Sequence, residues 1–221
     1  LLRENETLIR KPFMIPTTRW RIHEPREEIR DRLVEDLGIH PVIAQVLINR
    51  GIRNSDEARR YLYPSLKDLH NPFLLKDMKR GVDRVIRAIR DGERVAVFGD
   101  YDVDGAASTA MAMEICRGRA GTVRFFIPHR HDQGYGLHRS VMERLLPMGW
   151  DTLIVVDCGS KDYEILDSAA ASGINVFVFD HHQPEEGKPV HPSVVNPHCG
   201  GGDQEAKSLC ATGVLWAWAW K

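Results

Sequence analysis

The sequence predicts a doubly wound α/β fold, with a mainly parallel five-stranded sheet flanked by helices. Three runs of apolar and β-branched residues have the length and composition of strands that are buried on both faces, at residues 95–98, 152–156 and 175–179. Segments of helical character lie between these runs. The alternation of strand and helix is the pattern that builds a parallel sheet covered on both sides.

A helical leader over residues 1–92 is expected to pack on a second domain over residues 93–221. Its helices are predicted at residues 24–37, 41–49, 55–61 and 76–90. In the last of these, apolar residues recur at helical spacing and should pack on the sheet: Val82, Val85, Ile86 and Ile89. The second domain should contain helices at 106–117, 139–146 and 162–172, a short fifth strand at 193–195, and an apolar helix from about Thr212.

Composition sets limits on location and partners. The net charge of −1 hides an asymmetry, because residues 1–99 carry 20 Lys/Arg against 15 Asp/Glu and residues 100–221 carry 10 against 16. The basic half suits either a phosphate backbone or an ordinary solvated helical surface. Four widely spaced cysteines without a CxxC pair favour a reducing cytoplasm over a disulfide scaffold. No apolar run reaches the roughly eighteen residues that cross a membrane, and the first residues show no signal-peptide pattern.

Three aspartates at alternate positions follow the first predicted strand. Asp100, Asp102 and Asp104 are closed by Gly105, and their carboxylates repel one another unless a cation lies among them. Hard divalent cations such as Mg²⁺ and Mn²⁺ prefer oxygen ligands of this kind. The alternative is an acidic surface turn, in which Asp and Gly are common.

Two further polar motifs follow the other long strands. Asp157 comes directly after residues 152–156, and Asp180-His181-His182 comes after residues 175–179. Ligands of doubly wound sheets bind beyond the carboxyl ends of the strands. We therefore expect these motifs and the three aspartates to meet in one crevice.

The motifs, in this order and spacing, resemble those of the DHH phosphoesterase superfamily. The stretches Leu37-Gly-Ile-His-Pro, Tyr63-Pro-Ser-Leu and Ile127-Pro-His-Arg resemble its RecJ branch, and the likeness covers about residues 20–220. The resemblance implies a hydrolase that digests single-stranded DNA from the 5′ end, acts in DNA repair and recombination, and requires Mn²⁺ or Mg²⁺. Two such ions stabilise attacking and phosphate oxygens in phosphodiester hydrolysis.

Matching the motifs residue by residue implies four metal ligands: Asp102, Asp104, Asp157 and His181. Asp104 or Asp157 would bridge the two ions. His182 would face the scissile phosphate as a hydrogen-bond donor or acid, and Asp180 would orient a neighbouring histidine. Asp100 is ambiguous between direct ligation and outer support.

Several other residues are candidates for contact with substrate phosphate or bases. Gly105 and Ser108 begin a helix whose amides suit an anion, although small residues there equally suit helix–sheet packing. Arg130 is placed at a substrate phosphate by analogy with the RecJ branch. Tyr135 lies between two glycines and either stacks on a base or shapes a turn. Lys161 departs from the RecJ pattern and leaves the substrate preference open.

Two alternative functions are also compatible with the sequence. One is another enzyme of the superfamily, acting on nanoRNA, cyclic dinucleotides or pyrophosphate; the other is a non-catalytic replication scaffold.

The match to the superfamily's last motif ends before its final metal-binding aspartate, so we expect a fragment of the N-terminal catalytic region that is weakly active or inactive by itself. Single-stranded DNA is the expected partner, a single-strand-binding protein or a repair helicase is a candidate protein partner, and no membrane is expected.

Overall fold

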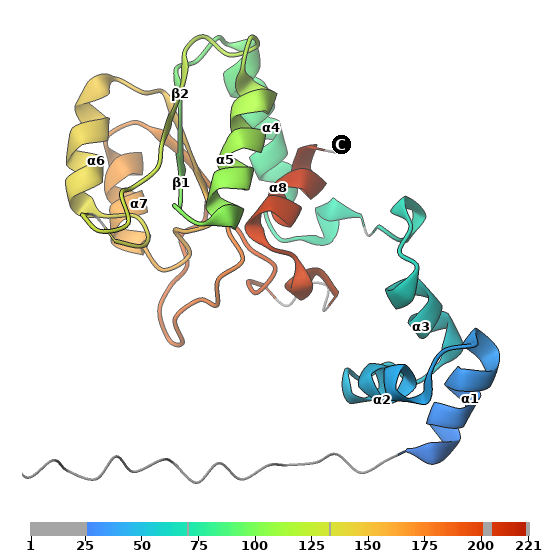
Figure 1. Ribbon diagram of the computed structural model, residues 1–221. Coiled ribbons are helices and arrows are strands. Elements are labelled where there is room, and N and C mark those ends of the chain that lie inside the picture. Colours follow the sequence, from blue (N-terminus) through green and yellow to red (C-terminus); the bar gives the residue numbers. More distant parts are fainter. Residues whose placement is uncertain (1–25, 70, 133, 201–204, 220–221) are drawn as a thin grey trace, which may run out of the picture. The chain divides into compact units, whose positions relative to one another are not determined.

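The computed structural model describes residues 26–69, 71–132, 134–200 and 205–219 (Figure 1). The chain divides into two compact units, residues 1–69 and 70–221. The sequence placed the division at residue 92 instead. The two divisions differ because helix α4, Met78–Arg90, belongs to the same hydrophobic core as the sheet.

The first unit is a small helical body. It contains α1 (Glu27–Leu37), α2 (Pro41–Asn49) and α3 (Ser55–Leu62), close to the predicted ranges. Residues 24 and 25 of the first predicted helix lie outside the described residues. Leu33, Leu47 and Ala58, one from each helix, are buried together and hold the three helices in place.

The second unit is built on a five-stranded sheet in which every strand is parallel to its neighbours, which confirms the predicted fold class. The strands are β1 (Val95–Gly99), β2 (Val123–Phe126), β3 (Thr152–Val156), β4 (Asn175–Phe179) and β5 (Val194–Val195), in the spatial order β2-β1-β3-β4-β5. The sequence assigned no residues to β2. This strand forms one edge of the sheet, and Phe125 in it is largely exposed.

Helices cover both faces of the sheet (Figure 1). Helices α4, α5 (Val103–Cys116) and α8 (Ala211–Ala219) pack on one face, and α6 (Arg139–Leu145) and α7 (Tyr163–Ala171) pack on the other. Alternate residues of each central strand enter opposite cores, so Ile154 packs with the first group and Val155 with the second. None of the helices in the described parts of the chain is long and apolar enough to cross a bilayer.

The predicted apolar stripe of α4 is confirmed at three of its four positions. Val82 and Val85 are buried against the sheet, and Ile89 packs beside them. The prediction was wrong for Ile86, which is 39% exposed, because this residue lies on the solvent side of the helix.

The register of the three central strands determines where the polar motifs emerge. Gly99 of β1 pairs with Val156 of β3, and Val156 pairs with Phe179 of β4. The next residues along the chain are therefore level with one another at the carboxyl edge of the sheet: Asp100, Asp157 and Asp180. This edge is the place where ligands of such folds bind.

Candidate active site

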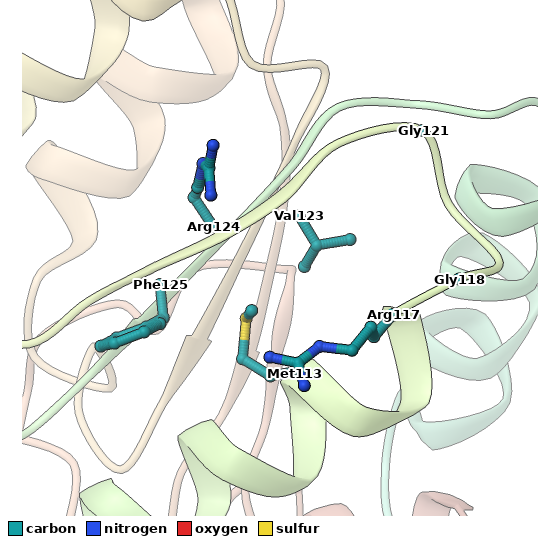
Figure 2. A pocket seen from close by; sticks show the side chains of 7 residues that line it. All are labelled: Met113, Arg117, Gly118, Gly121, Val123, Arg124 and Phe125. Carbon is teal, nitrogen blue, oxygen red and sulfur yellow. The ribbon is translucent and has the colours of Figure 1, made fainter.

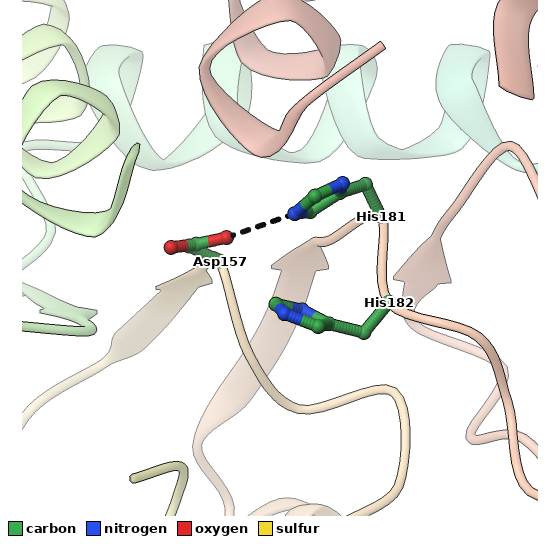
Figure 3. A group of neighbouring side chains, drawn as sticks. All are labelled: Asp157, His181 and His182. Atoms are coloured by element: carbon green, nitrogen blue, oxygen red, sulfur yellow. Dashed lines mark ion pairs between the residues drawn. The ribbon is translucent and has the colours of Figure 1, made fainter. Parts of the chain in front are cut away.

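The three acidic motifs meet at the carboxyl edge of the sheet. Asp157, His181 and His182 each offer a ligand atom within 4.8 Å of the others (Figure 3). A second group on the same criterion contains Asp100, Asp102 and Asp157. Asp157 belongs to both groups and is therefore the centre of the site.

Asp157 is a buried carboxylate without ordinary partners. Its side chain is fully buried, and neither oxygen accepts a good hydrogen bond from any residue that the structure describes. Burial raises the pKa of Asp157 to about 9, together with the charge of Asp104 and with the charge of Asp102, whose carboxylate hydrogen-bonds the protonated form of Asp157. Its backbone also adopts a left-handed conformation, with φ of 62°, which is uncommon for a residue other than glycine. Such a residue requires compensation from its surroundings, and a bound cation would provide it.

Asp180 is equally buried, but its carboxylate is fully hydrogen-bonded. Oδ2 accepts from the amide of Ser160 at 2.9 Å, and Oδ1 accepts from the amide of His181 at 2.7 Å and lies 2.8 Å from Nδ1 of His182. Burial raises the pKa of Asp180, but the bonds from His182 and Ser160 outweigh it, so the pKa is lowered overall. Asp180 is thus placed to orient His182, the role that the motif match implied.

His182 lies between Asp180 and Tyr135. The hydrogen bond to Asp180 raises the pKa of His182 against the opposing effect of burial. The hydroxyl of Tyr135 lies 2.8 Å from Nε2 and 3.0 Å from Nδ1 of the same ring, and the two rings meet edge to face. Because both nitrogens have neighbours, the imidazole suits proton donation better than metal ligation.

His181 points in the other direction, toward the carboxylates. Its Nε2 lies 3.4 Å from Oδ1 of Asp157 (dashed line in Figure 3) and 3.6 Å from Oδ2 of Asp104. Nε2 of His181 therefore lies next to an oxygen of each carboxylate and offers an imidazole nitrogen, a suitable ligand for a divalent cation, on this side of the site.

The remaining two aspartates of the first motif differ in their surroundings. Asp100 is buried, and this raises its pKa, while the amides of Tyr101 and Gly136 partly oppose the rise. Asp102 is exposed and caps the amino end of α5, because its Oδ1 accepts from the amide of Gly105 at 2.9 Å. Each lies close enough to Asp157 to complete a group of three carboxylates.

Asp104 makes contacts that the sequence did not predict. Its two oxygens accept hydrogen bonds from the amides of Ala211 and Thr212, at the beginning of α8. Burial raises the pKa of Asp104, but the bonds from Thr212 and Ala211 outweigh this effect and lower it overall. Asp104 falls outside both groups of three and approaches the site through its 3.6 Å contact with His181.

Gly105 and Ser108 have structural roles in this arrangement. A side chain at Gly105 would lie only 2.3 Å from the carbonyl oxygen of Asp100, so a residue without Cβ is required where the two backbones cross. Ser108 is fully buried, and its hydroxyl donates to the carbonyl of Asp104 at 2.7 Å. These positions favour the packing alternative over a phosphate contact.

Arg130 and Lys161 both remain exposed. The guanidinium of Arg130 lies over the ring of Tyr101, with 5.3 Å between its central carbon and the ring centroid. Tyr101 stands between Asp100 and Asp102, so this contact holds Arg130 beside the acidic cluster. Lys161 follows the Asp157 turn and lies close enough to influence the charge of His182.

A buried asparagine, Asn196, joins two loops of the site and was not predicted from the sequence. Nδ2 of Asn196 donates to the hydroxyl of Ser160 at 2.7 Å and to the main-chain carbonyl of His182 at 2.8 Å. Asn196 directly follows β5, so its place after a strand was the available signal. It ties together two of the loops that form the site.

A cavity of about 360 Å³ lies elsewhere in the second unit (Figure 2). Its lining includes Met113, Arg117, Val123 and Phe125, at the carboxyl end of α5 and along the edge strand β2. None of the described residues that line it is an acid or a histidine. The cavity therefore lacks the chemistry of the strand-end site, which lies at the opposite end of α5.

The donor set of the strand-end site fits a hard divalent cation. Buried carboxylate oxygens of Asp157 lack partners, an imidazole nitrogen lies 3.4 Å away, and two further carboxylates complete the surroundings. Oxygen-rich sites with one or two imidazoles are typical of Mg²⁺ and Mn²⁺.

Comparison with known proteins supports this geometry. The family model described as "DHH family, N-terminal domain" matches residues 94–220, more than half of the chain. The chain belongs to the DHH family. The match includes every strand of the sheet and all of the acidic motifs.

Several proteins similar to this DHH chain are named RecJ. The chain is 32% identical over 196 residues to the single-stranded-DNA-specific exonuclease RecJ of Bacillus subtilis, and the alignment covers 89% of this chain and 25% of that protein. With RecJ of Escherichia coli it is 29% identical over 190 residues, covering 86% and 32%. A crystal structure of RecJ from Thermus thermophilus in complex with Mn²⁺ superposes with a TM-score of 0.66 at 28% identity, covering 89% of this chain and 27% of that one.

The chain thus spans about a quarter to a third of the length of these RecJ relatives. The DHH fold and its strand-end site lie within this span.

Proposed function

We propose that this DHH chain is the catalytic region of a metal-dependent phosphodiesterase, a RecJ-like 5′-to-3′ exonuclease that hydrolyses single-stranded DNA in repair and recombination. The observation that carries the proposal is the buried, unpartnered carboxylate of Asp157 between two other acids and His181. The similarity to RecJ proteins supports the substrate class. We also propose residues 93–221 as the catalytic domain and residues 1–92 as its leader, whose last helix, α4, packs on the catalytic core.

Mn²⁺ or Mg²⁺, two ions per site, is the proposed cofactor, and the RecJ structure with Mn²⁺ supports this choice. The proposed ligands are Asp102, Asp104, Asp157 and His181, with Asp100 as outer support. When bound, the cations supply Lewis-acid stabilisation of phosphate oxygens and an acidified water.

His182 supplies a proton at the other side of the site. Asp180 accepts from its Nδ1 and raises its pKa, so the ring is held in its donor form. The hydroxyl of Tyr135 lies beside this ring, where an oxygen of the substrate would have to approach. Tyr135 and Arg130 are therefore proposed to help receive the phosphate that is hydrolysed, Arg130 by its charge and Tyr135 by its hydroxyl.

One assay separates the proposal from its rivals. The full-length protein is incubated with Mn²⁺ and 5′-labelled single-stranded DNA, duplex DNA, short RNA, cyclic dinucleotides and pyrophosphate. Release of mononucleotides from single-stranded DNA alone supports a RecJ-like enzyme. Preference for one of the small substrates supports another DHH enzyme, and no hydrolysis by the full-length protein supports a scaffold.

A cytoplasmic location is proposed from the four cysteines, which are all free in the structure. A single-strand-binding protein or a repair helicase is the proposed protein partner, because either would act on the same DNA strand. Co-purification of the tagged full-length protein with either partner, with nuclease treatment to remove bridging DNA, tests this proposal.

A further inference from the structure

The amino end of α8 makes a set of hydrogen bonds with Asp104, which lies more than a hundred residues earlier in the chain. The amide of Ala211 donates to Oδ2 at 2.7 Å, and the amide of Thr212 donates to Oδ1 at 2.9 Å. The hydroxyl of Thr212 lies 2.5 Å from the same Oδ1 and 3.1 Å from the main-chain carbonyl of Asp104. Asp104 therefore caps α8 from a remote position, and Thr212 contacts both its side chain and its backbone.

The two carboxylate oxygens of Asp104 accept hydrogen bonds from different donors. Each carboxylate oxygen has about two lone-pair directions. Oδ1 receives two donors, the amide and the hydroxyl of Thr212, and so is saturated. Oδ2 receives the amide of Ala211 and no contact from Thr212, and the thiol of Cys210 is a further hydrogen-bond partner of the same carboxylate.

The oxygen that Thr212 does not contact is the one that faces the site. Oδ2 of Asp104 is the atom 3.6 Å from Nε2 of His181, which in turn lies 3.4 Å from Oδ1 of Asp157. We infer that Thr212 is a positioning residue, which occupies Oδ1 of Asp104 and thereby presents Oδ2 to the metal. This inference rests on the proposed function, and it concerns how the metal ligand is oriented.

A simpler role for Thr212 would be to stabilise α8 alone. The two roles predict different outcomes, because replacement by valine keeps the shape of the side chain and both amide bonds but removes the hydroxyl. A purely structural role changes the thermal midpoint and leaves cation affinity as it was. A positioning role changes cation affinity, since the carboxylate is then held less firmly once the hydroxyl is lost.

The test measures Mn²⁺ affinity of the full chain by isothermal titration calorimetry and by the electron paramagnetic resonance of free Mn²⁺. Thr212→Val is expected to weaken binding about tenfold, the size usual for residues that orient metal ligands. Thr212→Ser, which restores the hydroxyl, is expected to bind within about twofold of the wild type. Thermal unfolding followed by circular dichroism shows that each variant is folded.

Thr109→Val is the matched control. Thr109 lies in α5, the helix that contains Asp104, and it is buried with a hydroxyl that has no hydrogen-bond partner within the described ranges. Its replacement should leave Mn²⁺ affinity unchanged. Wild-type affinity in Thr212→Val, or equal losses in Thr212→Val and Thr109→Val, would overturn the inference while leaving the proposed function intact. Absence of Mn²⁺ binding by the wild type would overturn both.

Discussion

Two aspartates at adjacent strand ends are equally buried but differ in the hydrogen bonds that their carboxylates accept. Asp157 after β3 and Asp180 after β4 are both almost completely inaccessible to solvent. Asp180 accepts hydrogen bonds from three main-chain amides and one imidazole, and its pKa is lowered. Asp157 accepts none of good geometry from the described residues, and its pKa is raised to about 9.

The difference shows that burial alone does not identify a metal ligand. A carboxylate whose lone pairs are all occupied by protein donors holds the neighbouring residues in position, as Asp180 orients the ring of His182. A carboxylate that is buried without donors is stabilised only by a proton or a cation.

Asp157→Asn is expected to reduce Mn²⁺-dependent hydrolysis of single-stranded DNA by about a thousandfold or more, because the central negative charge of the site is lost. Release of labelled mononucleotides measures the rate. Asp167→Asn, on the exposed side of α7, removes one carboxylate charge away from the strand ends and should retain activity. Near-wild-type hydrolysis by Asp157→Asn would remove this residue from the metal site.

Asp180→Ala is expected to destabilise the protein by about 3 kcal/mol, because it leaves several buried donors without an acceptor. Urea unfolding monitored by circular dichroism gives the free energy of unfolding. Metal-free Asp157→Gly, which leaves no donor without an acceptor and suits the left-handed backbone, should be much less destabilised. Similar losses in both variants would show that the two carboxylates do not differ in the way described.

Metal-free Asp157→Asn is expected to be more stable than the metal-free wild type at neutral pH by about 2 kcal/mol, since the buried Asp157 must take up a proton when the wild type folds and Asn need not. The folded wild type holds a proton on Asp157 up to a pKa of about 9, whereas the unfolded chain loses it near a pKa of about 4. The wild type should therefore lose stability as the pH rises between these values, and Asp157→Asn should lose less.

Urea unfolding at several pH values between these limits measures the effect, and EDTA ensures that the protein is free of metal. Addition of Mn²⁺ should reverse the order of stability, because only the wild type gains binding free energy. A wild type whose stability is constant over this range would contradict the assigned environment of Asp157.

Tyr135→Phe is expected to lower kcat/KM for single-stranded DNA about fivefold, the loss of one modest hydrogen bond beside His182. Tyr163→Phe is the control, because Tyr163 packs on His191 in another part of the unit. An unchanged kcat/KM would show that the Tyr135 hydroxyl is irrelevant to His182. A loss of several hundredfold would instead place this hydroxyl in the chemical step.

The sequence predicted the sheet well where strands are central. The runs at β1, β3 and β4 are buried on both faces, so their composition is continuous and apolar. Strand β2 lies at an edge and contains the exposed Arg124 and Phe125, so it lacks this signal. Helix α5 also begins earlier than predicted, at Val103, because Asp102 caps it.

The meeting of the three motifs was predictable because parallel strands present their carboxyl ends at one edge. The hydrogen-bond partners of the site were not, because they depend on contacts between remote loops. Thr212 contacts Asp104 from a helix more than a hundred residues later in the sequence, and Asn196 contacts Ser160 from the residue after β5. Composition and spacing contain no sign of such pairs.

The left-handed backbone of Asp157 restricts which residues can replace it. Asn and Gly adopt this conformation readily, whereas β-branched and most longer side chains are strained there. A change to Glu would therefore disturb the turn as well as move the carboxylate. The residue at this position must both supply the carboxylate and tolerate the left-handed backbone. Variants intended to probe charge alone are best limited to Asn, and Asp157→Gly is the natural probe of the side chain as a whole.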